Sequence, residues 1–271
     1  MILKIEDEMD LAKIAQSGQC FRWEALPGGA WRVVHRGKCL TIAPLDGGVF
    51  TLDCPEADFA SVWRDYFDLT ENYASIRSRI DPARDPFLGR AAEAERGIRI
   101  LRQEPWETLV SFIISQNKNI PAIRRAVAAL CGIAGETRTD AGGTPYRTFP
   151  AAEAVAALTE DELRACGLGY RARYVHAAAE AVCSGALDLP SLSRAEDEEV
   201  IERLCALCGV GVKVARCVAL YGLHRTDAFP IDVWVRRILD EQYPAGYPME
   251  EYRPYNGVYQ QYMFAYYRNR Q

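Results

Sequence analysis

Hydrophobic and polar positions follow two different spacings along this chain. Between residues 21 and 52, short β-branched and aromatic runs are interrupted by Pro-Gly-Gly, Arg-Gly-Lys and Asp-Gly-Gly, which predicts successive hairpins of an antiparallel sheet. From residue 56, large apolar side chains recur at intervals of three and four, which places them on one face of a helix. These side chains are Phe59, Val62, Trp63, Tyr66 and Phe67. Because helical patterns continue to the end, we expect an α+β fold: an N-terminal antiparallel sheet domain with flanking helices over residues 1–85, then a mostly α-helical body over residues 86–271.

Local signals refine the helical part. Pro105 follows Glu104 just before an apolar segment, where proline is typical of the first turn of a helix. Thr159 and Glu162 have the spacing of a capping box, which predicts another helix start. Residues 133–147 are rich in glycine and threonine, and we expect them to form a loop.

A Gly-Val-Gly turn joins two amphipathic segments and predicts a helix-hairpin-helix at about residues 196–223. Gly209 and Gly211 would let backbone N–H groups point outward at the start of the second helix, where they can bind a phosphate. Such a hairpin can hold a DNA backbone without reading its sequence. A helical hairpin needs glycine in its turn in any case, so a purely structural role stays open.

Lys213 and Asp232 are the candidate catalytic pair. Lys213 follows the glycine turn, and Asp232 stands nineteen positions later, before another helical pattern. Asp232 is therefore also an expected helix N-cap, and a lysine at this position is also compatible with a solvated surface residue. Two helix starts that face each other would bring an amine nucleophile next to a carboxylate able to stabilise positive charge on a sugar.

Composition and charge limit the remaining classes. No apolar run among the 271 residues approaches the roughly 20 that a membrane span needs, and the start "MILKIEDEMD" is acidic where a signal peptide is basic. We therefore expect a cytoplasmic protein, nucleoid-associated if prokaryotic, without a membrane partner. The net charge of −5 argues weakly against nucleic acid binding. Local basic clusters at 124–127, 170–174 and 235–239 can override that total.

The nine cysteines lack the spacing of a disulfide framework and are expected to be reduced. Cys205 and Cys208 form a C-x-x-C, but no second pair stands at ligand distance and no cysteine follows Cys217. A zinc site or an iron–sulfur cluster is therefore disfavoured, and neither a metal nor a cofactor is expected.

Five segments carry a resemblance to a known family. In chain order they are "SGQCFRW" at 17–23, "SFIISQNKNI" at 111–120, "GLGYRARYV" at 167–175, "LCGVGVKVARC…FPIDV" and "PYNGVYQQYMF" at 254–264. Together they resemble the 8-oxoguanine DNA glycosylase family of helix-hairpin-helix glycosylases. The resemblance implies a monomeric base excision repair enzyme that flips 8-oxoguanine out of double-stranded DNA. It also implies cleavage of the N-glycosidic bond by Lys213, with Asp232 as electrostatic partner, and strand nicking by β-elimination through a Schiff base.

The same resemblance implies a set of base-binding residues. The Gly18 carbonyl would accept a hydrogen bond from N7–H, which 8-oxoguanine has and guanine lacks. Cys217 and Phe264 would cover the two faces of the flipped base, and Gln260 would bind its Watson–Crick edge. Core packing remains an alternative for Cys217 and Phe264.

The resemblance also assigns residues on the DNA side. Tyr170 would insert into the base stack, with Asn117 and Arg171 reaching the orphaned base; a solvated helix start remains an alternative for this basic segment. Two positions depart from the family pattern. Ala122 stands where eukaryotic members carry a second arginine that reads the opposite cytosine, so we expect a relaxed opposite-base preference. Trp234 stands where a histidine is common, which puts that phosphate contact in doubt.

Two other functions remain as alternatives. An alkylated-base DNA glycosylase of the same superfamily would use the aspartate to activate water and has no hairpin lysine, so Lys213 argues against it. A non-catalytic DNA-binding protein would use the hairpin alone, and the pairing of Lys213 with Asp232 argues against that class. The missing C-terminal cysteines disfavour a cluster-bearing endonuclease.

Overall fold

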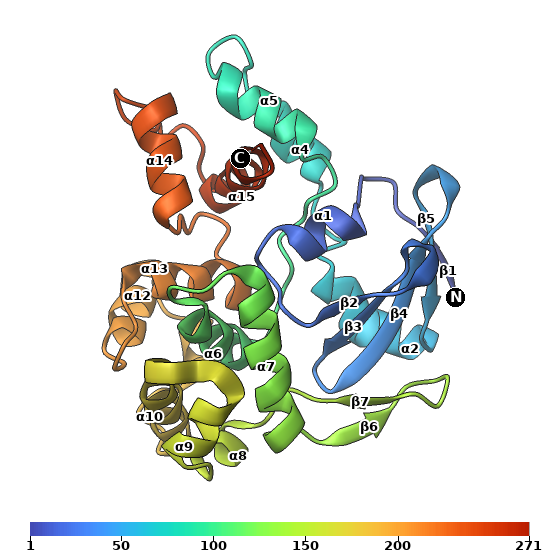
Figure 1. The fold of residues 1–271 in the computed structure, drawn as a ribbon. Helices are drawn as coiled ribbons and strands as arrows, with labels where there is room; N and C mark the ends of the chain where they lie inside the picture. The colour runs from blue at the N-terminus through green and yellow to red at the C-terminus, as the bar shows by residue number, and fades with distance from the viewer. Residues whose placement is uncertain (271) are drawn as a thin grey trace.

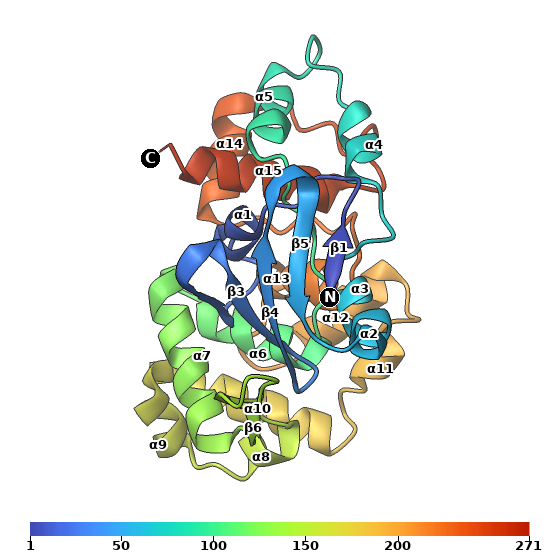
Figure 2. The same ribbon diagram turned by 90° about the vertical axis from the view of Figure 1, so that its right-hand side faces the viewer.

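A computed structural model describes residues 1–270. Five antiparallel strands form a sheet of order β1-β5-β4-β3-β2 on one side of the molecule, and the helical body lies on the other (Figure 1; Figure 2). The strands are β1 (Ile2–Lys4), β2 (Trp23–Ala25), β3 (Trp31–His35), β4 (Lys38–Pro44) and β5 (Val49–Asp53). The predicted hairpins are confirmed. Arg36 and Gly37 connect β3 to β4 with positive φ values of 47° and 68°, the conformation of a tight two-residue hairpin turn.

A small core lies between this sheet and two helical segments. Alternate residues of β3 and β4, such as Val33 and Leu40, point into it. The helix α1 (Leu11–Gln16) contributes Ile14. The predicted helix after residue 56 is continuous from Glu56 to Tyr66, in the order α2 (Glu56–Asp58), a π-type turn (Phe59–Trp63) and α3 (Arg64–Tyr66). Its apolar face buries Trp63 completely.

The larger core belongs to the helical body. Its longer helices are α5 (Pro86–Ala94), α6 (Pro105–Ser115), α7 (Ile120–Ala134), α10 (Ala172–Cys183), α12 (Asp197–Cys205), α14 (Val233–Gln242) and α15 (Asn256–Arg268). The shorter ones are α4 (Tyr73–Ser78), α8 (Ala152–Ala156), α9 (Glu160–Leu163), α11 (Leu189–Leu192) and α13 (Val212–Cys217). Tyr73, Ile76 and Ile80 pack into this larger core. Phe21 also belongs to this larger core and Leu101 to the small one, so packing does not assign a single division point, and the boundary at residue 85 stays a prediction.

The local start signals are confirmed. Pro105 lies in the first turn of α6, and Thr159 and Glu162 form the reciprocal bonds of a capping box. The helix-hairpin-helix is also confirmed: α12 leads through the glycine turn into α13, which continues as a π-type turn to Gly222. No helix within residues 1–270 has the length and apolar character to cross a membrane.

The prediction of a loop at residues 133–147 was wrong. This segment forms a small antiparallel hairpin of β6 (Thr137–Thr139) and β7 (Pro145–Arg147). The Arg138 guanidinium and the Tyr146 hydroxyl each donate to the carbonyl of Gly37, at 3.0 and 2.9 Å. Contacts with the β3–β4 turn, distant in sequence, therefore hold a segment whose composition alone indicates a loop.

Candidate active site

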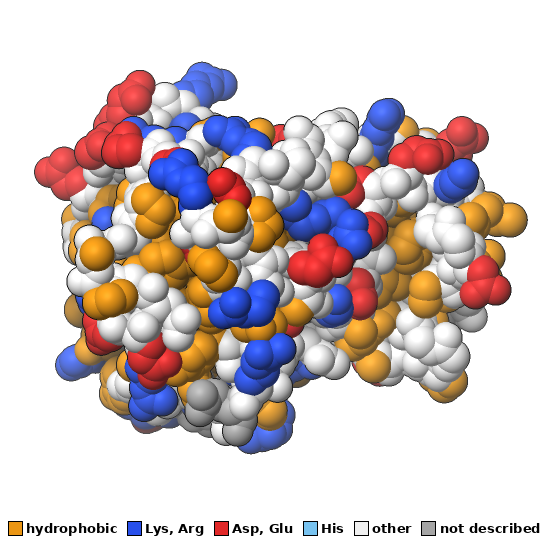
Figure 3. Space-filling model, turned by 90° about the horizontal axis from the view of Figure 1, so that it is seen from above, with side chains coloured by type: hydrophobic (Ala, Val, Ile, Leu, Met, Phe, Trp, Pro, Cys, Tyr) orange, Lys and Arg blue, Asp and Glu red, His pale blue; other side chains and the backbone are white. Residues whose placement is uncertain are grey.

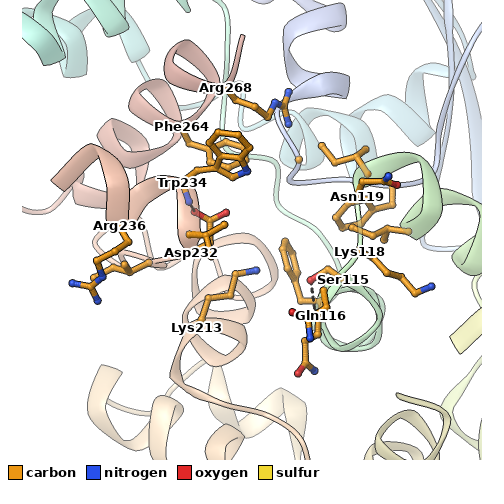
Figure 4. A pocket seen from close by; sticks show the side chains of 18 of the residues that line it. Ser115, Gln116, Lys118, Asn119, Lys213, Asp232, Trp234, Arg236, Phe264 and Arg268 are labelled. Atoms are coloured by element: carbon orange, nitrogen blue, oxygen red, sulfur yellow. Dashed lines mark hydrogen bonds between the residues drawn. The ribbon is translucent and has the colours of Figure 1, made fainter. Parts of the chain in front are cut away.

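A cleft of about 1130 Å³ opens where the N-terminal loop, the α6–α7 junction and the starts of α13 and α14 meet the end of α15. Lys213 and Asp232 both line it, and their side chains point toward the same part of the cleft (Figure 4). The structure thus brings together the two residues that the sequence singled out as a catalytic pair.

Lys213 is the second residue of α13 and is half-buried. Its Nζ lies 5.1 Å from the centre of the Phe112 ring, a cation–π contact with α6. One helical turn later, Cys217 is buried below it. Burial raises the pKa of the Cys217 thiol, although the Lys213 ammonium opposes the shift. Cys217 therefore presents a neutral, apolar surface.

Asp232 is the N-cap of α14, as predicted, and its two oxygens have different surroundings. Oδ1 accepts hydrogen bonds from the backbone N–H groups of Trp234 at 3.0 Å and Val235 at 2.8 Å. Within residues 1–270, no group donates to Oδ2. One oxygen fixes the side chain while the other remains available to a bound molecule.

Below the cleft lies a narrow cavity of about 50 Å³, lined by both members of the pair. All four predicted base-binding residues also line it: Gly18, Cys217, Gln260 and Phe264. Gln260 is 4% exposed, and its Oε1 has no hydrogen-bond partner among the described residues. A buried acceptor without a partner is costly, on the order of 1–3 kcal/mol. The cavity therefore carries a polar group that a ligand with a donor would satisfy.

Gly18 contributes its backbone. Its φ of +81° favours glycine, and a Cβ there would lie 3.4 Å from the Phe264 ring. No donor of residues 1–270 reaches its carbonyl. Gly18 thus adds a second free acceptor next to the cavity.

The residue predicted to enter the base stack and the two predicted to reach the orphaned base lie together beside the α6–α7 junction. Asn117, at φ +51°, donates from Nδ2 to the Tyr170 hydroxyl at 3.0 Å, and Tyr170 is 48% exposed. Arg171 is only 6% exposed. Its guanidinium donates to the carbonyl of Gln116, from Nε at 2.6 Å and also from Nη2, and to that of Leu168. To read an orphaned base, Arg171 would have to exchange these carbonyls for acceptors on the DNA, so that role stays a prediction.

The two hairpin glycines serve different purposes. Gly209 has a φ of +77°, and a Cβ there would collide with the Tyr174 ring at 2.3 Å. Gly211 is the N-cap of α13 with φ −99°, and nothing lies within 4 Å of where its Cβ would be. Glycine's conformational freedom is therefore required at Gly209 and not at Gly211. Open space at Gly211 leaves the first N–H groups of α13 accessible.

Sequence reasoning missed several residues that line the cleft. They are Phe112, Lys118, Asn119, Arg236, Arg237 and Arg268. The basic cluster at 235–239 was the available signal for two of them. Trp234 also lines the cleft, and its ring packs against that of Tyr267 with the ring centres 6.4 Å apart. On the face seen in Figure 3, basic and acidic side chains are interspersed. The excess of basic residues in the lining of the cleft is a local feature of a chain whose net charge is −5.

Comparison with known proteins identifies the family to which this chain belongs. A family model described as "8-oxoguanine DNA glycosylase, N-terminal domain" matches residues 1–109, and one described as "HhH-GPD superfamily base excision DNA repair protein" matches residues 110–248. The solved structure of MBOgg1 in complex with a low affinity DNA ligand is similar at 35% identity and a TM-score of 0.93, covering 99% of this chain and 95% of that one. The chain belongs to the 8-oxoguanine DNA glycosylase family.

Other members of this glycosylase family are similar as well. The Clostridium acetobutylicum 8-oxoguanine glycosylase/lyase, solved with double-stranded DNA containing cytosine opposite 8-oxoguanine, is 31% identical with a TM-score of 0.91, covering 100% of this chain and 98% of that one. The N-glycosylase/DNA lyase of Saccharomyces cerevisiae is 45% identical over 159 residues, 55% of this chain. That match covers 42% of the yeast protein, so the chain matches less than half of its length. The family resemblance and the fold expected from the sequence are confirmed.

Proposed function

We propose that this chain is a bifunctional DNA glycosylase and AP lyase that removes 8-oxoguanine from double-stranded DNA. The proposal rests on one observation: the two catalytic candidates line the same cavity as the predicted base-binding residues. Lys213 and Asp232 line the same narrow cavity as Gly18 and Gln260, and Asp232 Oδ2, the Gly18 carbonyl and Gln260 Oε1 have no donor partner among residues 1–270.

In the proposed reaction the Lys213 amine nitrogen attacks the anomeric carbon of the flipped nucleotide. The bond from that carbon to the base breaks, and its electron pair leaves with the base, which takes up the proton that the amine nitrogen loses on forming its new bond. The sugar ring then opens to give a Schiff base with Lys213. Loss of a proton from the adjacent sugar carbon expels the 3′ phosphate and nicks the strand. Asp232 Oδ2 stabilises the positive charge that develops on the sugar in the first step.

Base recognition would use the residues that line the cavity. Cys217 and Phe264 would contact the two faces of the base, and Gln260 Oε1 would accept from N–H groups on its Watson–Crick edge. The Gly18 carbonyl would accept from N7–H of 8-oxoguanine, whereas guanine would present a lone pair to it. A repelled buried acceptor costs about 1–3 kcal/mol, so this contact supplies part of the selectivity. The cavity of about 50 Å³ holds little more than one water molecule at roughly 30 Å³ each, so its lining would have to open to admit a base.

On the DNA side, Tyr170 is the exposed aromatic ring available to fill the gap left by the flipped nucleotide. Asn117 lies within hydrogen-bond distance of it and would reach the orphaned base. The first N–H groups of α13 at Gly211, together with Arg236 and Arg237, would bind phosphates. Gly209 would shape the turn that presents those N–H groups.

Borohydride trapping tests the proposal. Reduction should cross-link the wild-type protein covalently to a duplex containing 8-oxoguanine, because borohydride reduces the Schiff base. Lys213→Gln should abolish the cross-link and base release while DNA binding is retained. An enzyme of the alkylated-base type would activate water and keep its excision activity in Lys213→Gln. Trapping that persists in Lys213→Gln would refute the assigned nucleophile.

A further inference from the structure

The segment around Gly18, from the end of α1 to Gln19, is held by hydrogen bonds to its backbone carbonyls. Every carbonyl from residue 14 to 19 accepts a hydrogen bond except that of Gly18, among the bonds formed within residues 1–270. In each bond a side chain donates to a backbone carbonyl: Ser17 to that of Ile14, Arg124 to that of Ala15, Arg268 to that of Gln16, Gln261 to that of Ser17 and Gln103 to that of Gln19. The free carbonyl therefore lies between neighbours that are individually anchored.

The anchor next to Gly18 is a buried side-chain relay. Gln261 on α15 is 1% exposed and donates from Nε2 to the Ser17 carbonyl at 2.9 Å. The Tyr221 hydroxyl donates to Gln261 Oε1 at 2.6 Å. Burial raises the pKa of the Tyr221 phenol well above its usual value, so this hydroxyl stays a donor. Because Oε1 is occupied by a donor, the amide must turn its N–H toward Ser17.

The same relay lies next to the catalytic lysine. The Tyr221 ring stacks on Phe112 with centroids 5.4 Å apart and an interplanar angle of 13°. Lys213 Nζ lies 5.1 Å from the centre of the same Phe112 ring. Tyr221 also lines the narrow cavity. One set of packed side chains thus spans the distance between the nucleophile and the recognition loop.

We propose that Gln261 and Tyr221 are positioning residues that hold the Gly18 carbonyl in the place where it distinguishes 8-oxoguanine from guanine; this inference rests on the proposed function. Glycine at φ +81° gives the loop conformational freedom, so its geometry has to be imposed from outside. A recognition group must be held to within about 0.5 Å to be effective. The hydrogen bond to Ser17, one residue before Gly18, provides that constraint.

The test compares two reactions of the same active site. Excision of 8-oxoguanine needs both the recognition loop and Lys213, whereas cleavage at a pre-formed abasic site needs Lys213 but no base contact. Gln261→Leu removes both hydrogen bonds of the relay, and Tyr221→Phe removes only the outer one. The matched control is Tyr259→Phe, which removes an equally buried hydrogen bond from α15, the one to the Ile76 carbonyl at 2.9 Å, without touching the loop.

We expect Gln261→Leu to lower the single-turnover rate of 8-oxoguanine excision at least tenfold while abasic-site cleavage stays within about twofold of wild type. Tyr221→Phe should lower the excision rate a few-fold and, like Gln261→Leu, leave abasic-site cleavage within about twofold of wild type. This second variant keeps the test valid if Gln261→Leu does not fold. Tyr259→Phe should leave both rates unchanged.

Either of two results would overturn this inference and leave the proposed function intact. The first is that Tyr221→Phe and Gln261→Leu lower excision and abasic-site cleavage equally; the second is that both variants excise 8-oxoguanine at the wild-type rate. A wild-type protein that cleaves abasic sites but does not release 8-oxoguanine would instead refute the proposed function, and the inference with it.

Discussion

Replacing Asp232 by asparagine should separate its structural task from its chemical one. The cap uses Oδ1 for both hydrogen bonds, to Trp234 and Val235, and the asparagine oxygen can keep both. Asparagine caps about as well as aspartate, so the free energy of unfolding should change by less than about 0.5 kcal/mol. The amide puts a neutral NH₂ group where Oδ2 stood. Loss of a pre-organised electrostatic contact in an active site costs on the order of 3 kcal/mol, or about a hundredfold in excision rate.

Asp232→Ala provides the complementary measurement. It removes the charge and the cap together, so excision should fall at least as far. The lost cap should also lower the free energy of unfolding by about 1 kcal/mol and the melting temperature by about 2–4 °C. The matched control is Asn72→Ala, which removes the N-cap of α4, a bond to the Ser75 N–H at 2.8 Å, outside the cleft. That variant should lose stability and keep the wild-type excision rate.

The assay is single-turnover excision of 8-oxoguanine, with DNA affinity and thermal unfolding measured on the same preparations. Excision by Asp232→Asn within a few-fold of wild type would show that the carboxylate acts only as a cap. A loss of DNA affinity equal to the loss of rate would instead place its contribution in binding.

Two further predictions concern partner choice and stability. Ala122 offers no donor to an orphaned cytosine, so the wild type should excise 8-oxoguanine opposite thymine, guanine or adenine at rates nearer to the cytosine pair than eukaryotic relatives do. Ala122→Arg should raise the cytosine preference about tenfold or more; single-turnover rates on four duplexes measure it, and an unchanged preference contradicts it. Burial would raise the pKa of the Asp68 carboxyl, but hydrogen bonds from His224 and Arg102 outweigh burial and lower it below 3.8. The stability that the carboxylate contributes is therefore present above pH 3.8 and lost as pH falls through the lowered pKa. Asp68→Asn should cost about 2 kcal/mol at pH 7, and in denaturant titrations its difference from wild type should shrink below pH 3.8; a difference that does not depend on pH would refute this reasoning.

The sequence by itself determined the elements and the catalytic candidates, because their signals are local. Apolar spacing of two or of three and four residues indicates which face of a strand or helix is buried, as for the strands within 21–52 and the helix containing Trp63. Caps such as Thr159 and Asp232 act on N–H groups two or three residues away. The motifs around Lys213 and Asp232 were sufficient to recognise the family.

The tertiary structure decided which polar groups are occupied and which remain free. The hydrogen bond from Gln261 to Ser17 joins residues 244 positions apart, and the one from Arg171 to Gln116 joins residues 55 apart. No local pattern shows that the first anchors the loop of Gly18 or that the second keeps Arg171 from solvent. The pairing of β1 with β5 and the β6–β7 hairpin likewise depend on distant partners. A hydrogen bond depends on the positions of both groups in space, and only the folded chain sets those positions.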